Sequence, residues 1–130
     1  MQKISIGVDI ENISKFENYN QQKKQKILKK IFTDFEIKYC LEKINPAQHL
    51  AARFAAKEAI IKAMSSKTDS KFLPNEIEIR NKENGKPEVV IKNNFIFNEN
   101  ILISMSHNDG NAIAFAVILN QSGENWIEKN

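Results

Sequence analysis

Two carboxylates lie in predicted apolar segments, where a charged side chain needs a chemical reason. Asp9 interrupts the strand-like segment Ile-Gly-Val-Asp-Ile, although aspartate is disfavoured within strands. Glu58 lies in a helix-like segment between Phe54 and Ile61, which places it at the edge of the apolar surface. Glu11 projects to the same side as Asp9 if the strand continues. Magnesium requires two or three hard oxygen ligands while phosphates and water fill its other positions, so these residues are candidate magnesium ligands.

Both carboxylates also have ordinary structural explanations. Lys62 follows Glu58 by four residues, and such a helical ion pair stabilises by about 0.2–0.5 kcal/mol. Asp9 is suited to an Asx turn or N-cap that closes the strand before Asn12. The pattern alone favours the ion pair for Glu58 and leaves the metal site as the alternative.

Histidine, serine and cysteine chemistry has little support in the sequence. Ser106 and His107 look like a nucleophile and its base, but adjacent strand residues point to opposite faces and no acid is placed to orient the histidine. His107 is better suited to donating to a phosphate, packing beside a bound base, or ending a strand. Cys40, His49 and His107 lack the spacing of zinc ligands, so zinc is a poor candidate.

The helices that must position these residues are expected in the first half of the chain. A strand over 4–10 is expected in the core. A helical pattern then covers 12–32, with an interruption expected at 20–22. Thr33-Asp34-Phe35-Glu36 is a capping-box sequence that begins a helix ending near Ile44. Asn45-Pro46, an N-cap followed by proline, begins the long helix over 46–66.

The second half of the chain is predicted to be β after a polar loop over 65–75. Two hairpins are expected, each joined by a turn with glycine. Their strands cover 76–80 and 88–91 around Asn84-Gly85, then 101–106 and 112–119 around Asn108-Asp109-Gly110. The fold class is therefore α+β, with an antiparallel sheet packed against a long central helix.

Length and composition indicate one ordinary globular domain. The 130 residues are 42% hydrophobic and 27% charged, with no apolar run long enough to span a bilayer. The first residues reach Asp9 too soon for a secretory leader, and Cys40 is the single cysteine. We expect a cytoplasmic protein with its domain over 1–120 and a tail over 121–130.

Lysines gather near the start of the chain, opposed by Glu17 alone. They are Lys15, Lys23, Lys24, Lys26, Lys29 and Lys30. Such a cluster attracts an anionic partner, although a solvated helix face has the same composition. An RNA- or ribosome-binding module is one alternative, but the net charge is only +3 and no aromatic-rich RNA-binding signature is present.

Four motifs follow one another along the chain in a recognisable order and spacing. They are Gly7-Val8-Asp9-Ile10-Glu11-Asn12-Ile13, Phe54-Ala55-Ala56-Lys57-Glu58-Ala59-Ile60-Ile61-Lys62-Ala63, Asn84-Gly85-Lys86-Pro87 and Ser104-Met105-Ser106-His107. With this order and spacing the chain resembles the holo-acyl-carrier-protein synthases, the small phosphopantetheinyl transferases of bacterial fatty-acid synthesis. The resemblance runs from about Ile4 to about Leu119.

The resemblance implies a phosphopantetheinyl transferase-like fold and the transfer of phosphopantetheine from coenzyme A to a serine of apo-acyl-carrier protein. It implies Mg²⁺ held by Asp9 and Glu58, with Lys62 near the phosphates. Glu11 resembles the second acid of the Asp-x-Glu in the larger transferases and is therefore expected as a third metal ligand. It also implies a homotrimer with sites at subunit interfaces and no nucleic-acid or membrane partner. Coenzyme A is expected to contact Lys62, His107, Arg53 and Lys86. The acidic carrier protein is expected to dock on a first helix beginning near Lys15, through Lys15, Lys23, Lys24 and Lys26.

The sequence departs from the family in two places, and a second enzymatic alternative remains open. Ser65-Ser66-Lys67-Thr68-Asp69-Ser70 replaces the usual glycines after Ala63, which changes the expected phosphate-binding loop. Lys15 replaces an arginine, exchanging a bidentate fork for a point charge. A magnesium-dependent phosphohydrolase could use a similar pair of acids.

Overall fold

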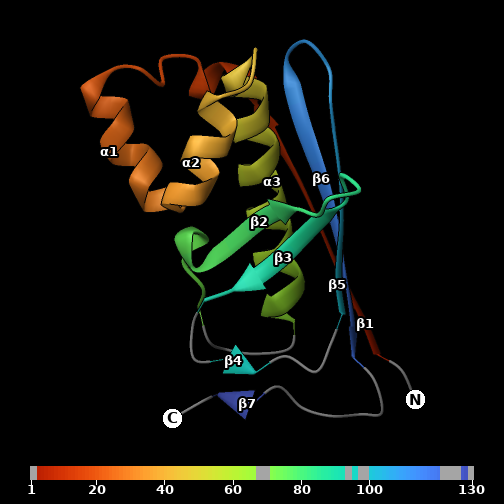
Figure 1. Ribbon diagram of the computed structural model, residues 1–130. Helices are drawn as coiled ribbons and strands as arrows, with labels where there is room; N and C mark the ends of the chain where they lie inside the picture. Colours follow the sequence, from red (N-terminus) through yellow and green to blue (C-terminus); the bar gives the residue numbers. More distant parts are fainter. Residues whose placement is uncertain (1–2, 67–70, 93–94, 97–99, 121–126, 129–130) are drawn as a thin grey trace.

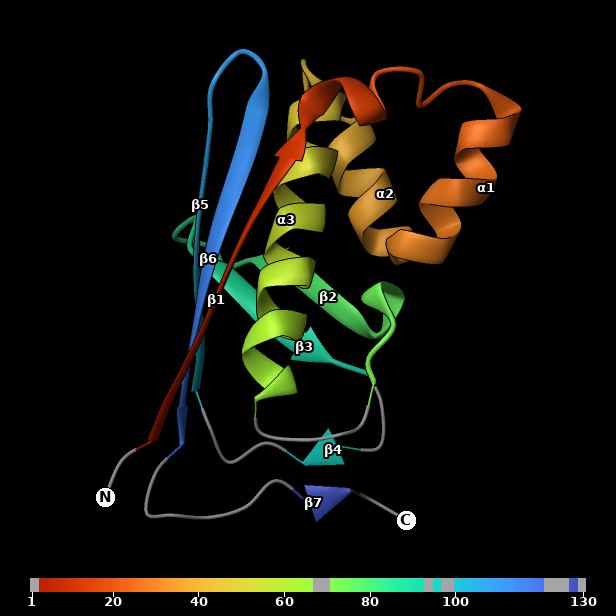
Figure 2. The same ribbon diagram turned by 180° about the vertical axis from the view of Figure 1, so that it is seen from behind.

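A three-stranded antiparallel sheet and one long helix form the centre of the molecule. The structure is a computed structural model that describes residues 3–66, 71–92, 95–96, 100–120 and 127–128. The sheet has the order β1-β6-β5, from Lys3–Asn12, Asn111–Asn120 and Asn100–His107. Helix α3 (Pro46–Ser65) lies along one face of this sheet (Figures 1 and 2). The predicted α+β class is confirmed.

The remaining helices lie on the side of α3 away from this sheet (Figure 2). They are the 3-10 turn η1 (Ile13–Phe16), α1 (Gln22–Ile31) and α2 (Asp34–Leu41). A hairpin of β2 (Ile77–Asn81) and β3 (Pro87–Ile91) follows the turn η2 (Pro74–Glu76). The short strands β4 (Phe95–Ile96) and β7 (Ile127–Glu128) pair with each other, and neither was predicted.

The helix starts follow the predicted signals in two of three cases. The capping box is present, because the Thr33 hydroxyl accepts from the Glu36 N–H and the Glu36 carboxylate accepts from the Thr33 N–H. Pro46 begins α3 as expected, but the Asn45 side chain makes no capping bond. The prediction that the first helix begins near Lys15 is wrong, because Lys15 lies in η1 and α1 begins only at Gln22.

The apolar alternation of β1 is correct, but its apolar face is not covered by the helix. Ile4, Ile6, Val8 and Ile10 are 64%, 62%, 49% and 61% exposed, so our placement of this strand in the core was wrong for its isoleucine face. The opposite face carries Gly7 and packs against α3. The reason is steric, because the helix approaches so closely that only small side chains fit beneath it.

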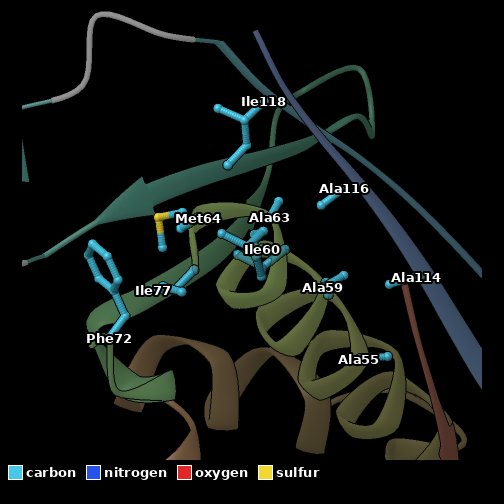
Figure 3. Close-up of a cluster of buried hydrophobic side chains, with 12 residues drawn as sticks. Ala55, Ala59, Ile60, Ala63, Met64, Phe72, Ile77, Ala114, Ala116 and Ile118 are labelled. Carbon is cyan, nitrogen blue, oxygen red and sulfur yellow. The ribbon is translucent and has the colours of Figure 1, made fainter. Parts of the chain in front are cut away.

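Alanines on both elements make this close contact possible. Ala55, Ala59 and Ala63 of α3 belong to the same buried cluster as Ala114 and Ala116 of β6 (Figure 3). Larger side chains fill the rest of this cluster, among them Met64, Phe72, Ile77 and Ile118. Because protein interiors are close-packed, small residues at the contact set the short distance between helix and sheet.

Gly7→Ala should destabilise the protein by about 1–3 kcal/mol, the usual range for overpacking a tight contact. A methyl group at Gly7 would lie 2.0 Å from the carbonyl oxygen of Ala59 and 3.0 Å from the backbone nitrogen of Ala63. Urea denaturation measures the loss. Gly110→Ala is the matched control, because a methyl group there meets nothing within 4 Å. Equal stability of the two variants would show that α3 does not need this close approach.

Candidate active site

Asp9 lies on the helix-facing side of β1 and meets a lysine from α3. Its Oδ1 accepts a hydrogen bond from the Lys62 ammonium at 3.1 Å, and the same ammonium donates to the Val8 carbonyl at 3.0 Å. The Asp9 side chain is only 12% exposed, whereas that of Lys62 is 56% exposed. The second carboxylate oxygen, Oδ2, is buried and has no hydrogen-bond partner. Half of this buried carboxylate therefore lacks a donor or cation, which is costly in a folded protein.

Glu58 is the second carboxylate of this site. Its pKa is raised first by burial and then by the negative charge of Asp9, while Lys62 acts in the opposite direction. The predicted ion pair between Glu58 and Lys62 is not formed, because in the described part of the chain Lys62 bonds to Asp9 instead. Lys62 therefore pairs with a strand residue that lies 53 residues away in sequence, and not with Glu58 on its own helix.

Glu11 extends the carboxylate group along β1. It is buried, and its Oε1 accepts from the Lys15 ammonium at 3.0 Å. Burial raises the pKa of Glu11, and the neighbouring Asp9 carboxyl raises it further, while Lys15 acts in the opposite direction. Asp9 therefore interacts with a carboxyl group on each side, one from its own strand and one from α3.

The chemistry of this donor set fits a magnesium ion that is only partly surrounded by protein. The donors are hard carboxylate oxygens, and one of them, Asp9 Oδ2, is buried without a partner. Within the residues that the structure describes, no group of three or more His, Cys, Asp or Glu residues is arranged to hold a metal. Magnesium is commonly bound by one or two carboxylates, with its remaining positions left to water and substrate phosphates.

The other predicted site residues lie elsewhere in the described structure. His107, at the end of β5, is exposed, as is Lys86, whose N–H donates to the Asn84 side chain. Arg53 is buried: its guanidinium stacks over the Tyr39 ring at 4.2 Å, and its Nη2 donates to Asn81 at 2.6 Å. No hydrogen bond or ion pair among the described residues joins these three to Asp9 or Glu58.

Part of the expected site falls outside the described residues, because residues 67–70 of the loop that replaces the family glycines are not described. Ser65 and Ser66 are described, and both hydroxyls donate to carbonyls of the last turn of α3, those of Lys62 and Ala63.

Sequence reasoning missed Lys57, the neighbour of Glu58. Its side chain is completely buried and forms an ion pair with Glu36, whose side chain is also completely buried. The available signal was a lysine among the apolar helix positions Ala56 and Ile60, which a solvated lysine would not occupy. We had assigned Glu36 only to the capping box.

The chain is similar to a known family of enzymes. Residues 5–118 match the 4'-phosphopantetheinyl transferase superfamily. A holo-[acyl-carrier-protein] synthase of Thermodesulfovibrio yellowstonii is 45% identical over 113 residues, which cover 87% of this chain and 96% of that protein. The same enzyme of Chlorobaculum parvum is 39% identical, with coverage of 88% and 97%.

Solved structures agree with these sequence matches. The structure of a holo-(acyl-carrier-protein) synthase from Bacillus anthracis, in complex with CoA (3',5'-ADP), superposes with a TM-score of 0.75. It is 26% identical, and the match covers 93% of this chain and all of that one. The Helicobacter pylori enzyme in complex with coenzyme A gives a TM-score of 0.71 at 28% identity, with coverage of 87% and 98%.

Glu58→Gln should stabilise the metal-free protein at neutral pH. The folded-state pKa of Glu58 is raised above 4.5, so its stabilising contribution is present below the unfolded pKa and is lost as the pH rises through the folded pKa. Glutamine imitates the neutral acid at every pH. The gain should therefore appear in urea denaturation with chelator at pH 7 and vanish near pH 4.

Glu88→Gln, at an exposed position on β3, is the control and should change little at either pH. A glutamine at position 58 that destabilises the metal-free protein at pH 7 would contradict the assigned repulsion between Glu58 and Asp9.

Proposed function

Because the chain belongs to the 4'-phosphopantetheinyl transferase superfamily, among its holo-acyl-carrier-protein synthases, we propose that its reaction depends on magnesium held by Asp9 and Glu58. The reaction transfers 4'-phosphopantetheine from coenzyme A to a serine of apo-acyl-carrier protein. The serine oxygen bonds to the phosphorus that carries pantetheine, and the bond from that phosphorus to the bridging oxygen breaks. Adenosine 3',5'-bisphosphate leaves with that oxygen.

The observation that carries the magnesium proposal is the buried, unpartnered Oδ2 of Asp9 beside a second carboxyl group whose pKa is raised. When bound, the metal would neutralise negative charge on the diphosphate of coenzyme A. Glu11 is expected as a third ligand, but the described residues include no group of three or more His, Cys, Asp or Glu that could hold a metal, so the proposal rests on Asp9 and Glu58.

The remaining chemistry falls to side chains of α3. Lys62 is more than half exposed, so its ammonium can turn from Asp9 towards a substrate phosphate without leaving a buried position. Glu58 is the proposed acceptor of the serine proton, because a carboxylate with a raised pKa holds a proton better than an ordinary one.

Three further residues are proposed to contact coenzyme A. Lys86 and His107 are exposed and can reach a ligand, while buried Arg53 has an Nε without an acceptor in the described structure. A raised Michaelis constant for coenzyme A in Lys86→Ala and His107→Ala, with that for carrier protein unchanged, supports the assignment. Unchanged constants for coenzyme A would remove both residues from the site.

A homotrimer with sites at its interfaces is the proposed assembly, and its support is the uncovered face of the three-stranded sheet. Large apolar side chains from all three strands are exposed there, which is typical of a protein–protein contact. They are Ile4, Ile6, Val8, Ile10, Leu102, Ile113 and Phe115. Sedimentation at about three times the 14.9 kDa chain mass supports the trimer, and a fully active monomer would exclude it.

The domain is proposed to cover 1–120 with a tail over 121–130, in agreement with the family match over 5–118. Among the described residues, no helix is long and apolar enough to cross a bilayer. A cytoplasmic location is proposed from the single cysteine, Cys40, which is a buried free thiol. Cell fractionation that places the protein in a membrane or secreted fraction would contradict it.

The lysines at the start of the chain are the proposed docking surface for the acidic carrier protein. Lys23 and Lys26 of α1 are exposed, whereas Lys15 pairs with Glu11 and Lys24 donates to the Lys15 carbonyl at 3.0 Å. The proposed docking surface thus combines exposed lysines on α1 with Lys15, which pairs with Glu11 of β1.

Reversal of Lys23, Lys24 and Lys26 to glutamate should raise the Michaelis constant for carrier protein and leave that for coenzyme A unchanged. Added salt should weaken the wild type towards this variant, because ions screen exposed charges over about 8–10 Å. Steady-state kinetics at low and high salt measures both effects. If the variant has a normal Michaelis constant for carrier protein at low salt, these lysines only form a solvated helix face and do not dock the carrier protein.

Transfer itself is tested by mass spectrometry with apo-carrier protein, coenzyme A and magnesium. The wild type should add the mass of phosphopantetheine, and chelation should stop the reaction. Asp9→Ala and Glu58→Ala should each abolish transfer while remaining folded, because each removes a metal ligand. Glu88→Ala, an exposed carboxylate of β3, is the control and should transfer normally.

The other outcomes identify the alternatives. Hydrolysis of coenzyme A without acceptor would indicate a phosphohydrolase. The absence of both reactions would favour a basic binding module. Near-normal turnover of either alanine variant at limiting magnesium would show that the metal ligands are assigned wrongly.

A further inference from the structure

Lys57 is a completely buried cation that joins five elements. Its ammonium lies 2.5 Å from the Glu36 carboxylate of α2, and three backbone carbonyls also surround it. These carbonyls belong to Ile31 at the end of α1, Pro74 in η2 and Ile77 at the start of β2, at 3.0, 3.0 and 2.6 Å. A single side chain of α3 is therefore bonded to α1, α2, η2 and β2.

Glu36 is held as firmly as its partner. One carboxylate oxygen accepts from the Thr33 N–H at 2.9 Å, and the other accepts from the Ile79 N–H of β2 at 2.8 Å. Thr33 in turn donates to buried Glu78 at 2.6 Å. The ion pair is thus part of a hydrogen-bonded network that fixes the position of the Lys57 ammonium from several directions.

On the opposite side, the described bonds between α3 and the sheet lie near the end of the helix, where Ser5 donates to the Ala63 carbonyl and the exposed Lys62 donates to Val8 and Asp9. There the helix rests on the sheet through Ala55, Ala59 and Ala63, with backbone close to Gly7. Such small side chains set the distance between helix and sheet, but they give few protrusions that would resist rotation of the helix about its axis. Glu58 lies on this smoother side, where it must meet Asp9.

Consecutive helical residues differ by about 100° around the axis, so fixing the direction of Lys57 fixes that of Glu58. We propose that the buried Lys57–Glu36 ion pair sets the rotation of α3 and thereby holds Glu58 against Asp9. Lys57 is then a positioning residue for transfer. This inference rests on the proposed role of Glu58.

Stability alone does not account for such a pair. Two buried charges lose their hydration, and replacement of a buried ion pair by apolar groups is often neutral or stabilising. Directed bonds, in contrast, specify one arrangement among several that an alanine-rich contact would tolerate. The pair can therefore serve to select one orientation of α3, and with it one arrangement of the site.

The test is the double variant Glu36→Gln/Lys57→Met, which removes both charges and leaves neither uncompensated. It should remain folded, while kcat falls at least about tenfold, because small misplacement of a catalytic group costs that much or more. The Michaelis constant for carrier protein should stay unchanged. Binding of Mn²⁺ alone, followed by the electron paramagnetic resonance of the free ion, should weaken about tenfold as well.

Two further variants make the result decisive. Lys92→Met is the control, because it removes an exposed lysine paired with Glu78 at 3.2 Å from the edge of the same network and should leave kcat and Mn²⁺ binding unchanged. Glu36→Asp alone keeps both charges and the three carbonyl partners of Lys57 but shortens the carboxylate side chain, and should show the same losses to a smaller degree. If the double variant unfolds, this variant tests the proposal in its place.

A folded double variant with kcat and Mn²⁺ affinity within about twofold of the wild type would overturn the proposal. So would losses that follow the fraction of unfolded protein, because a merely structural role predicts that relation. Glu58→Ala is measured alongside. If it also binds Mn²⁺ and turns over normally, the site assignment fails; if it is inactive while the double variant is normal, only the positioning role fails.

Discussion

The close approach of helix α3 to strand β1 is the constraint on which the site depends. Asp9 comes from the strand, and Glu58 and Lys62 come from the helix, so their chemistry exists only where these elements nearly touch. Gly7 permits the contact, because any side chain there would meet the backbone at Ala59. Alanines on α3 and β6 extend the same short distance along the helix.

This contact places like charges together, and the protein keeps them there. Burial raises the pKa of Glu58 and Glu11, and proximity to Asp9 raises both further. Only Lys62 and Lys15 pair with this group among the described residues, and both lysines are more than half exposed. An arrangement that disfavours the metal-free state is typical of a functional site, where stability is given up for binding.

The two sides of α3 have complementary tasks. On the sheet side, small residues let the helix approach β1 closely, so that carboxylates from the two elements come near each other. The other side carries the Lys57–Glu36 pair, which links the helix to α2 and β2 by directed bonds. The two faces of β1 differ in the same way, because the outer face exposes apolar side chains while the inner face carries Asp9.

Local signals in the sequence determined most of the elements, while the pairing of charges was decided by the tertiary structure. The capping box at Thr33 and the turn at Gly85, with φ of +84°, act over a few residues and could be predicted. Alternation in β1 showed two faces but not which one the helix covers, since that depends on the fit of Gly7 under α3. The spacing of four residues predicted an ion pair between Lys62 and Glu58, yet in the folded chain Lys62 pairs with Asp9. Burial of Lys57 was equally hidden, because its carboxylate and carbonyl partners come from elements 17 to 26 residues away and meet only when the chain has folded.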